Sequence, residues 1–177
     1  YYMDDNLLGI SNLKRIKKFL NNHTNKYDVV ILIDYGHGFL NNEIYKILSK
    51  KSKYLAINCQ TNSANLGFNL ITKYPRSDFI CIDEPELRLA ASNNNDPIEK
   101  IVKEQIIKKI RCKNITITRG RNGSFSYTKS KTLVTPALIS EKVLDTIGAG
   151  DVFLVISSLL HSIKAVSYTH LTLPTIE

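Results

Sequence analysis

The sequence has no tryptophan, and its 177 residues include only one methionine, three cysteines, five prolines and eight glycines. So few glycines and prolines exclude a collagen-like chain, and 43% hydrophobic residues exclude an intrinsically disordered one. Three cysteines without a repeated spacing argue against a disulfide framework and indicate a reducing compartment. The sequence also lacks an apolar run of about 18 residues, which a membrane span needs, and a recognisable signal peptide. We therefore expect a cytoplasmic globular protein with no membrane partner.

Acidic residues are the minority charge, which leaves a formal net charge of +8. A basic domain can bind nucleic acid. The excess, however, comes from 18 lysines and only 6 arginines, in a chain with 22 isoleucines and 16 asparagines. Lys, Ile and Asn share AT-rich codons, so coding bias explains the charge. We interpret the lysine clusters at 14–18 and 50–53 as solvated helix faces, because they have little aromatic interleaving, and we expect no nucleic-acid partner.

Near-continuous apolar runs alternate with segments of helical periodicity along the chain. The expected strands are 27–33, 54–58, 78–83, 114–118, 124–128 and 133–135. The expected helices are 13–20, 41–49, 64–74, 85–91, 98–111 and 152–165. Apolar runs of this kind are typical of parallel strands that are buried on both faces. The alternation predicts an α/β fold with a doubly wound, mainly parallel sheet flanked by helices.

Polar clusters follow four of the expected strands, at 34–38, 58–62, 83–86 and 118–123. In doubly wound sheets, ligands bind outside the carboxyl ends of the strands. We therefore expect these clusters to meet in one site at that edge of the sheet.

The sharpest local signal is the string DTIGAGD at Asp145–Asp151, directly before an apolar helical run. Two glycines around an alanine leave a bare backbone, whose N–H groups and positive helix end can hold an anion. A carboxylate beside a bound phosphate repels it, so it would not help a site that only binds the phosphate. It becomes useful if Asp151 takes a proton from a hydroxyl that attacks the phosphoryl group. The alternative is an ordinary helix start with an acid in its first turn, which the macrodipole favours.

This string matches the signature D-T-x-G-A-G-D of the ribokinase-like (PfkB) carbohydrate kinases, which the sequence resembles over roughly residues 27–165. The resemblance implies that Asp151 is the catalytic base and that Gly148, Ala149 and Gly150 form the anion hole. It further implies that ATP and Mg²⁺ are bound.

Two more segments resemble motifs of this family. The segment DEPE at 83–86 stands where the family has N-x-x-E, so the resemblance implies a Mg²⁺-organising role for Glu86 and, with an acid in place of the amide, for Asp83. The segment TRGRNG at 118–123 is similar to a T-x-G-x-x-G turn that contacts the nucleotide. The nucleotide-binding residues implied in this way are Thr118, Gly120, Gly123 and Thr146.

Within the family, the segment DYGHG at 34–38 is similar to the D-Y-x-K-G segment of heptose 7-phosphate kinases of ADP-heptose synthesis, with His37 in place of the lysine. Residues 58–69 resemble a divergent branch of these kinases that is sometimes fused to a nucleotidyltransferase. The substrate-binding candidates are Asp34, His37, Asn58, Gln60 and Asn62, of which the last three either bind the sugar or cap the turn. The expected partners are a sugar or sugar-phosphate substrate, a fused or separate nucleotidyltransferase and a second copy of the complete protein.

We thus expect ATP-dependent phosphorylation of a sugar or sugar-phosphate hydroxyl. A nucleotide- or sugar-binding module without catalysis is the alternative, because Asp83 and His37 depart from the motifs; a basic nucleic-acid-binding fragment is the least favoured. Residues 1–165 are interpreted as a partial kinase domain that lacks its N-terminal substrate and lid part and its C-terminal end. Residues 166–177, without Lys or Asn, resemble a translated sequencing adapter and are interpreted as a non-native tail. We expect this fragment alone to be inactive.

Overall fold

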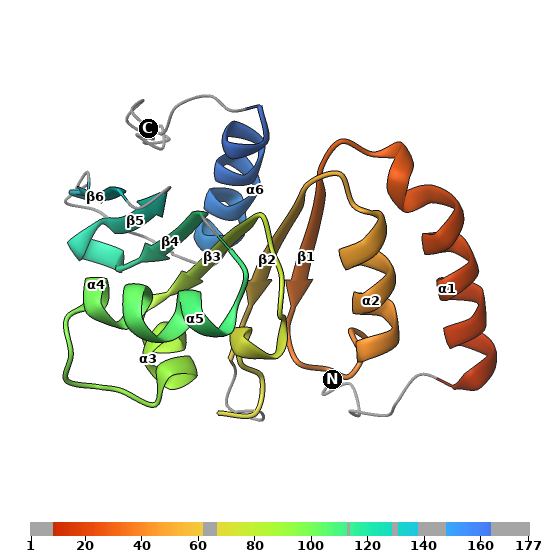
Figure 1. Ribbon diagram of the computed structural model, residues 1–177, viewed down its shortest axis with the longest axis horizontal. Coiled ribbons are helices and arrows are strands. Elements are labelled where there is room, and N and C mark those ends of the chain that lie inside the picture. The colour runs from red at the N-terminus through yellow and green to blue at the C-terminus, as the bar shows by residue number, and fades with distance from the viewer. Residues whose placement is uncertain (1–8, 62–66, 113, 129–130, 138–147, 164–177) are drawn as a thin grey trace.

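The computed structural model describes residues 9–61, 67–112, 114–128, 131–137 and 148–163, and its centre is one mixed sheet (Figure 1). The described strands lie in chain order: β1 (Val30–Asp34), β2 (Leu55–Cys59), β3 (Phe79–Asp83), β4 (Asn114–Thr118), β5 (Ser124–Thr128) and β6 (Lys131–Thr135). The first four are parallel, and β5 and β6 extend the sheet antiparallel. The predicted α/β fold with a mainly parallel sheet is confirmed.

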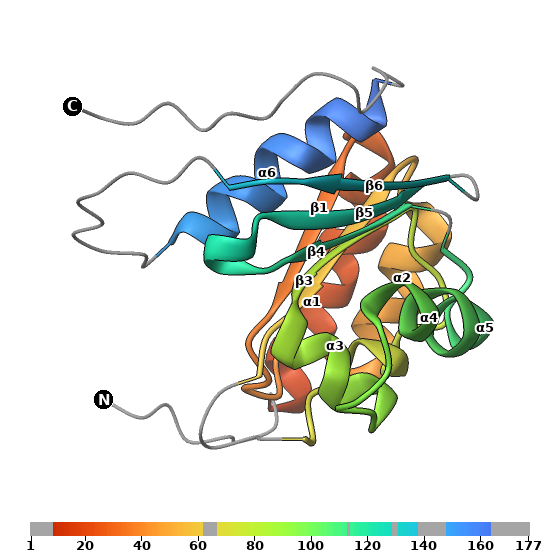
Figure 2. The same cartoon turned by 90° about the vertical axis from the view of Figure 1, so that its left-hand side faces the viewer.

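Helices cover both faces of this sheet (Figure 2). One face carries α1 (Ile10–His23), α2 (Asn42–Lys51), α3 (Glu84–Ala91), α4 (Ile98–Ile101), the π-helix η3 (Val102–Ile106) and α5 (Ile107–Lys109). We call it the helix-layer face. The other face carries α6 (Ala149–Ser162), and we call it the α6 face. Short 3₁₀ turns η1 (Thr24–Lys26), η2 (Ile71–Lys73) and η4 (Gly120–Asn122) connect the elements.

The alternation of side chains along each strand divides the apolar residues between the two faces. In β2, Leu55 and Ile57 join the large core under the helix layer, whereas Ala56 joins a smaller cluster with Leu154 of α6. All five residues of β2 are buried. The sequence of this strand is apolar except for Asn58, because both of its faces are covered.

The structure corrects one predicted helix. Of the segment 64–74, the described residues 67–74 hold only the 3₁₀ turn η2 and no α-helix. Two local features disfavour an α-helix there: Gly67 has a positive φ of +81°, and Tyr74 is extended before Pro75. In addition, the Asn69 side chain hydrogen-bonds strand ends instead of standing on a helix surface.

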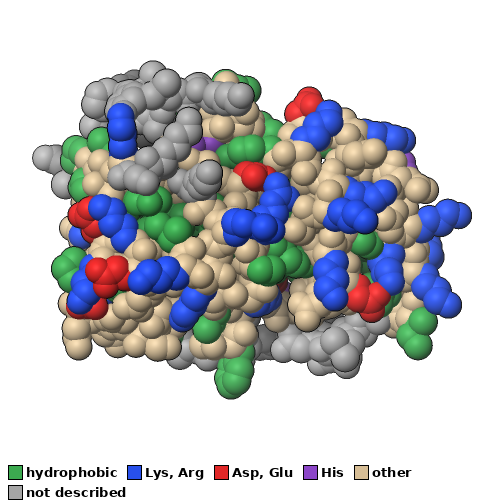
Figure 3. Space-filling model, in the orientation of Figure 1, with side chains coloured by type: hydrophobic (Ala, Val, Ile, Leu, Met, Phe, Trp, Pro, Cys, Tyr) green, Lys and Arg blue, Asp and Glu red, His purple; other side chains and the backbone are tan. Residues whose placement is uncertain are grey.

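The basic side chains are dispersed over the face of the molecule that Figure 3 draws. On the face seen in Figure 3, Lys and Arg side chains are scattered over several elements with acidic side chains between them. Several lysines are paired with acids, for example Lys17 with Glu43, Lys53 with Asp28 and Lys103 with Glu99. This distribution fits solvated helix faces. None of the described helices combines the length and the apolar character that crossing a membrane requires.

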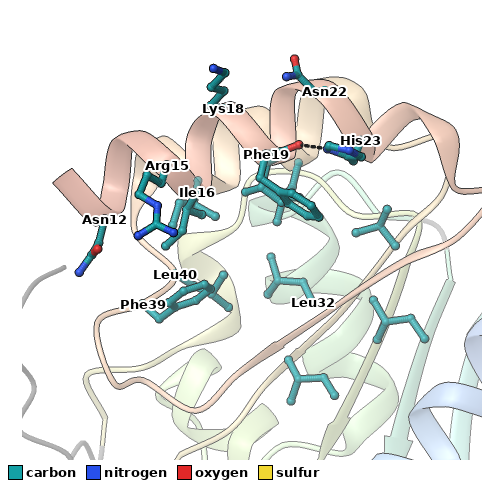
Figure 4. A pocket seen from close by; sticks show the side chains of 16 residues that line it. Asn12, Arg15, Ile16, Lys18, Phe19, Asn22, His23, Leu32, Phe39 and Leu40 are labelled. Atoms are coloured by element: carbon teal, nitrogen blue, oxygen red, sulfur yellow. Dashed lines mark hydrogen bonds between the residues drawn. The ribbon is translucent and has the colours of Figure 1, made fainter. Parts of the chain in front are cut away.

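A cavity of about 990 Å³ lies between α1 and the edge strand β1, lined by apolar side chains such as Ile16, Phe19 and Leu40 (Figure 4). Residues of both faces of β1 contribute to it, because β1 has no neighbour on its outer side among the described strands. The apolar lining indicates that the described residues cover the edge of the sheet at β1 incompletely. The residues that line the cavity do not include Asp151, Gln60 or Glu86.

Candidate active site

The helix α6 begins at an uncapped glycine. Gly148 occupies the N-cap position with φ +79° and ψ −8°, a left-handed conformation that favours glycine, and no side chain of the described residues caps the helix. The N–H groups at the start of a helix have no partner within the helix, so this end is positively polarised. Among the described residues, a Cβ atom added at Gly148 or Gly150 would meet nothing within 4 Å. The exposed segment 148–150 therefore has both the donors and the room to hold an anion.

The start of α6 points to the carboxyl ends of the parallel strands. Leu154 packs on Ala56, Phe79 and Cys81, and farther along the helix the His161 ring stacks on Phe79 at 4.5 Å between centroids. Because Phe79 begins β3, the helix runs back along the strand, and its N-terminus comes to the strand's end. Asp151, in the first turn, thus lies at the edge where ligands bind in such sheets.

Two side chains from neighbouring strand ends hold the Asp151 carboxylate. The Tyr35 hydroxyl donates to Oδ2 at 3.2 Å, and the Gln60 amide Nε2 donates to Oδ1 at 3.1 Å. Gln60 is one of the predicted substrate contacts, and the structure brings it to Asp151. Sequence reasoning missed Tyr35, although its place directly after a buried strand is the signal that could have found it.

Asp34, a predicted substrate contact, is buried with 3% of its surface exposed and faces the helix layer. Its carboxylate accepts a hydrogen bond from the Tyr74 hydroxyl at 2.5 Å and from the Gly36 N–H at 2.9 Å, and it forms an ion pair with Lys73. Burial and the Asp34 charge raise the pKa of Tyr74 well above its usual range. Asp34 therefore acts in this structure as an internal anchor.

The other predicted substrate contacts lie near the same strand ends. Asn58 is buried, and its Nδ2 donates to the Cys81 carbonyl at 2.9 Å, while its Oδ1 has no hydrogen-bond partner in the described part of the chain. His37 is exposed, between two glycines with positive φ. Asn62 lies outside the described residues, as do Asp145 and Thr146.

The predicted metal-organising acids Asp83 and Glu86 form the capping box of α3. The Glu86 N–H donates to Asp83 Oδ1 at 2.7 Å, and the Asp83 N–H donates to Glu86 Oε2 at 3.0 Å. The other oxygen, Glu86 Oε1, accepts from the Thr61 N–H at 3.1 Å. Burial raises the pKa of Glu86 to about 7 and also raises that of Asp83.

The described residues contain no group of three or more His, Cys, Asp or Glu side chains that could hold a metal ion. Both Glu86 oxygens already accept backbone hydrogen bonds, so direct coordination of Mg²⁺ would compete with the capping box. The two acids fit Mg²⁺ if they contact it through its bound water molecules. Mg²⁺ usually keeps several of these waters when a protein binds it.

The predicted nucleotide turn at 118–123 lies between β4 and β5. Thr118 is in register with Asp83 of β3, and Gly120 and Gly123 have φ values of +53° and +77°. A Cβ at Gly123 would come 1.9 Å from the Thr135 carbonyl oxygen, so the backbone at the end of β6 requires glycine there. Arg119 Nε donates to Glu84 Oε2 at 3.2 Å and ties the turn to the start of α3.

The carboxyl ends of β1, β2, β3 and β4 therefore meet at one edge of the sheet with the start of α6. Residues just after β1, β2 and β4 make the connecting hydrogen bonds. Tyr35 and Gln60, after β1 and β2, bond Asp151. Thr61, after β2, bonds Glu86, and Arg119, after β4, bonds Glu84. The arrangement combines a half-buried carboxylate, helix N–H groups that no described side chain caps and an acidic pair, which together are chemically suited to transfer of a phosphoryl group to a hydroxyl.

Comparisons with known proteins agree with this geometry. A model described as pfkB family carbohydrate kinase matches residues 17–164. No curated protein matches the chain. Among solved structures, a mutant of phosphofructokinase-2 from Escherichia coli is similar with a TM-score of 0.72 and 12% identity, over 90% of this chain and 52% of that chain.

Two further solved structures show the same fold. Ribokinase from Arabidopsis thaliana, complexed with ribose and ATP, has a TM-score of 0.58 and 15% identity, over 89% of this chain and 47% of that chain. Adenosine kinase from Sinorhizobium meliloti has a TM-score of 0.60 and 17% identity, over 81% of this chain and 45% of that chain. The chain spans about half the length of these proteins.

Proposed function

Because the chain belongs to the pfkB family of carbohydrate kinases, we propose that the complete protein transfers the γ-phosphoryl group of ATP to a hydroxyl of a sugar or a sugar phosphate. The observation that carries the proposal is the pairing of Asp151 with the exposed start of α6, which no described side chain caps. A carboxylate at this place would repel a bound phosphate unless a proton arrives on it during the reaction. The similarity to a ribokinase solved with ribose and ATP supports this choice of substrates.

Asp151 acts as the general base. Each of its oxygens accepts one hydrogen bond from a neutral donor, and a carboxylate oxygen can accept two. A lone pair remains on each oxygen for the proton of the attacking hydroxyl. The N–H groups of residues 148–150 then stabilise the negative charge that develops on the transferred group.

The nucleotide lies across the ends of β3 and β4 in this proposal. We assign Thr118, Gly120, Gly123 and Thr146 to the nucleotide, and a Cβ at Gly120 would meet no described atom within 4 Å, which leaves room for a ligand. Asp83 and Glu86 would hold Mg²⁺ through water, since both Glu86 oxygens already accept backbone hydrogen bonds. When bound, the metal neutralises charge on the phosphates of ATP.

Within the family, we favour a sugar phosphate of the heptose 7-phosphate type. The support is the DYGHG segment at 34–38, where His37 is exposed between two turn-forming glycines at the end of β1. The exposed His37 is the described polar group that we assign to the substrate, together with Asn62, whereas the Asn58 Oδ1 atom is buried in this structure. The three cysteines are buried and form no disulfide with one another, which fits a reducing compartment such as the cytoplasm.

The experiment is a measurement of ADP release by the complete protein with ATP, Mg²⁺ and a panel of sugars and sugar phosphates that includes a heptose 7-phosphate. We expect release that depends on one class of sugar. Absence of sugar-dependent release across the panel, with ATP binding retained, would instead support a binding module without catalysis.

A further inference from the structure

We propose that Gln60 and Tyr35 are positioning residues for phosphoryl transfer, which hold the two oxygens of the Asp151 carboxylate in a fixed orientation toward the substrate hydroxyl. The inference rests on the proposed role of Asp151 as base. Its basis is the pair of hydrogen bonds at 3.1 Å and 3.2 Å, one to each carboxylate oxygen.

The sheet places these two donors side by side. Asp34 and Cys59 are in parallel register as the last residues of β1 and β2, so Tyr35 and Gln60 follow at equivalent positions. The Gln60 N–H donates to the Asp34 carbonyl at 2.8 Å, which continues the parallel pairing by one more residue. Since Asp34 and Cys59 face the helix layer, alternation directs the next residue of each strand to the α6 face.

A buried layer behind the strand ends makes this placement rigid. Asn69 is buried and donates from Nδ2 to two strand-end carbonyls, that of Gln60 at 2.8 Å and that of Asp34 at 3.1 Å. Tyr74 and Lys73 hold the Asp34 side chain. The backbone that carries both donors is thus fixed by contacts on the side opposite Asp151, as a preorganised base requires.

The chemistry of the two donors suits a base. An amide and a phenol are uncharged donors, so they fix the orientation of the carboxylate without placing a positive charge beside it. Burial and the Asp151 charge raise the pKa of Tyr35, so its hydroxyl stays protonated and remains a donor at neutral pH. Gln60 is half-buried, whereas Tyr35 is 43% exposed, so we expect the larger contribution from Gln60.

The test uses steady-state kinetics of the complete protein with ATP and the sugar that supports ADP release. Loss of a hydrogen bond to a charged group predicts a fall in kcat of roughly tenfold for Gln60→Leu and roughly threefold for Tyr35→Phe, with KM for ATP unchanged. Gln60→Glu keeps the shape but cannot donate at neutral pH, and it should lose at least as much as Gln60→Leu. The matched controls Gln105→Leu, in η3, and Tyr27→Phe, ahead of β1, should leave kcat unchanged.

Repetition of Gln60→Leu and Gln60→Glu in an Asp151→Asn background separates positioning from folding. Residues that act only through Asp151 cause no further loss of kcat once the base is absent, so we expect strongly non-additive effects. Equal losses in both backgrounds, or an unchanged kcat in the single variants, would overturn the positioning role. Normal turnover of the Asp151→Asn protein would instead overturn the proposed base itself, so the two failures are distinguishable.

Discussion

At the scale of single residues, Glu86 is a half-buried carboxylate with two opposing influences on its ionisation. Backbone N–H groups of Asp83 and Thr61 bond both of its oxygens, which favours the ionised form, yet burial outweighs them and raises its pKa to about 7. The motif identified Glu86 from the sequence. Its contact with Thr61 depends on how β2 meets α3, so the burial could not be predicted from the sequence alone.

The raised pKa predicts a pH dependence of stability. The folded chain holds the Glu86 proton more tightly than the unfolded chain, whose pKa is the ordinary 4.5, so the free energy of unfolding falls as pH rises from 4.5 to about 7. The fall is at most about 3 kcal/mol. Urea unfolding at about pH 5 and about pH 8 should show that Glu86→Gln removes most of this difference.

Glu43→Gln is the matched control, because Lys17 lowers the pKa of exposed Glu43 and places its contribution at lower pH. The Glu43→Gln control should keep the difference in the free energy of unfolding between about pH 5 and about pH 8 that the unmodified chain shows. An Asp83 contribution of the same sign remains in both variants. If Glu86→Gln left this difference in the free energy of unfolding unchanged, the raised pKa of Glu86 would not be its cause.

At the scale of elements, turn chemistry and apolar runs predicted the strands well, and β4 and β5 match the expected residues 114–118 and 124–128. The predicted helix over 64–74 was wrong, because the buried Asn69 amide serves the ends of β1 and β2 instead. Local periodicity cannot reveal such a tertiary demand. Local sequence also cannot show why position 123 must be glycine, because the requirement comes from the backbone at the end of β6.

Gly123→Ala should therefore destabilise the chain strongly. The added Cβ would meet the Thr135 oxygen at 1.9 Å and would stand at φ +77°, so the end of β6 must shift. We expect a loss of more than about 2 kcal/mol in the free energy of unfolding, measured by urea denaturation.

Gly120→Ala is the matched control within the same turn. It has φ +53° but open space around its Cα, so only backbone strain of about 1 kcal/mol is expected. If the two variants were equally stable, the close approach of β6 would not be what requires glycine at position 123.

At the scale of the whole molecule, apolar surface remains exposed at two places. Val152, Val155, Leu159 and Ile163 are exposed at spacings that place them on one side of the α6 segment, and β1 has an open outer edge among the described strands. The sequence predicted strand–helix alternation. It could not show that the described strands lie in simple chain order, because that order depends on long-range packing.

This surface predicts self-association of the 177-residue chain. Val155→Gln combined with Leu159→Gln removes half of the α6 stripe without touching buried Leu154, and should lower association in sedimentation experiments at equal protein concentration. Ile10→Gln, which replaces an exposed apolar side chain on α1, is the control and should change association little. Unchanged association of the double variant would exclude the α6 stripe as its cause.

The most direct test of the central claim, that Asp151 is the base at the start of α6, is the turnover of the Asp151→Asn form of the complete protein with ATP and its sugar. We predict a fall in kcat of about a hundredfold to ten-thousandfold with nearly unchanged affinity for ATP, measured by calorimetry. Asp96→Asn, at an acid in the loop before α4, should keep full turnover. Turnover of Asp151→Asn close to that of the unmodified protein would contradict the account.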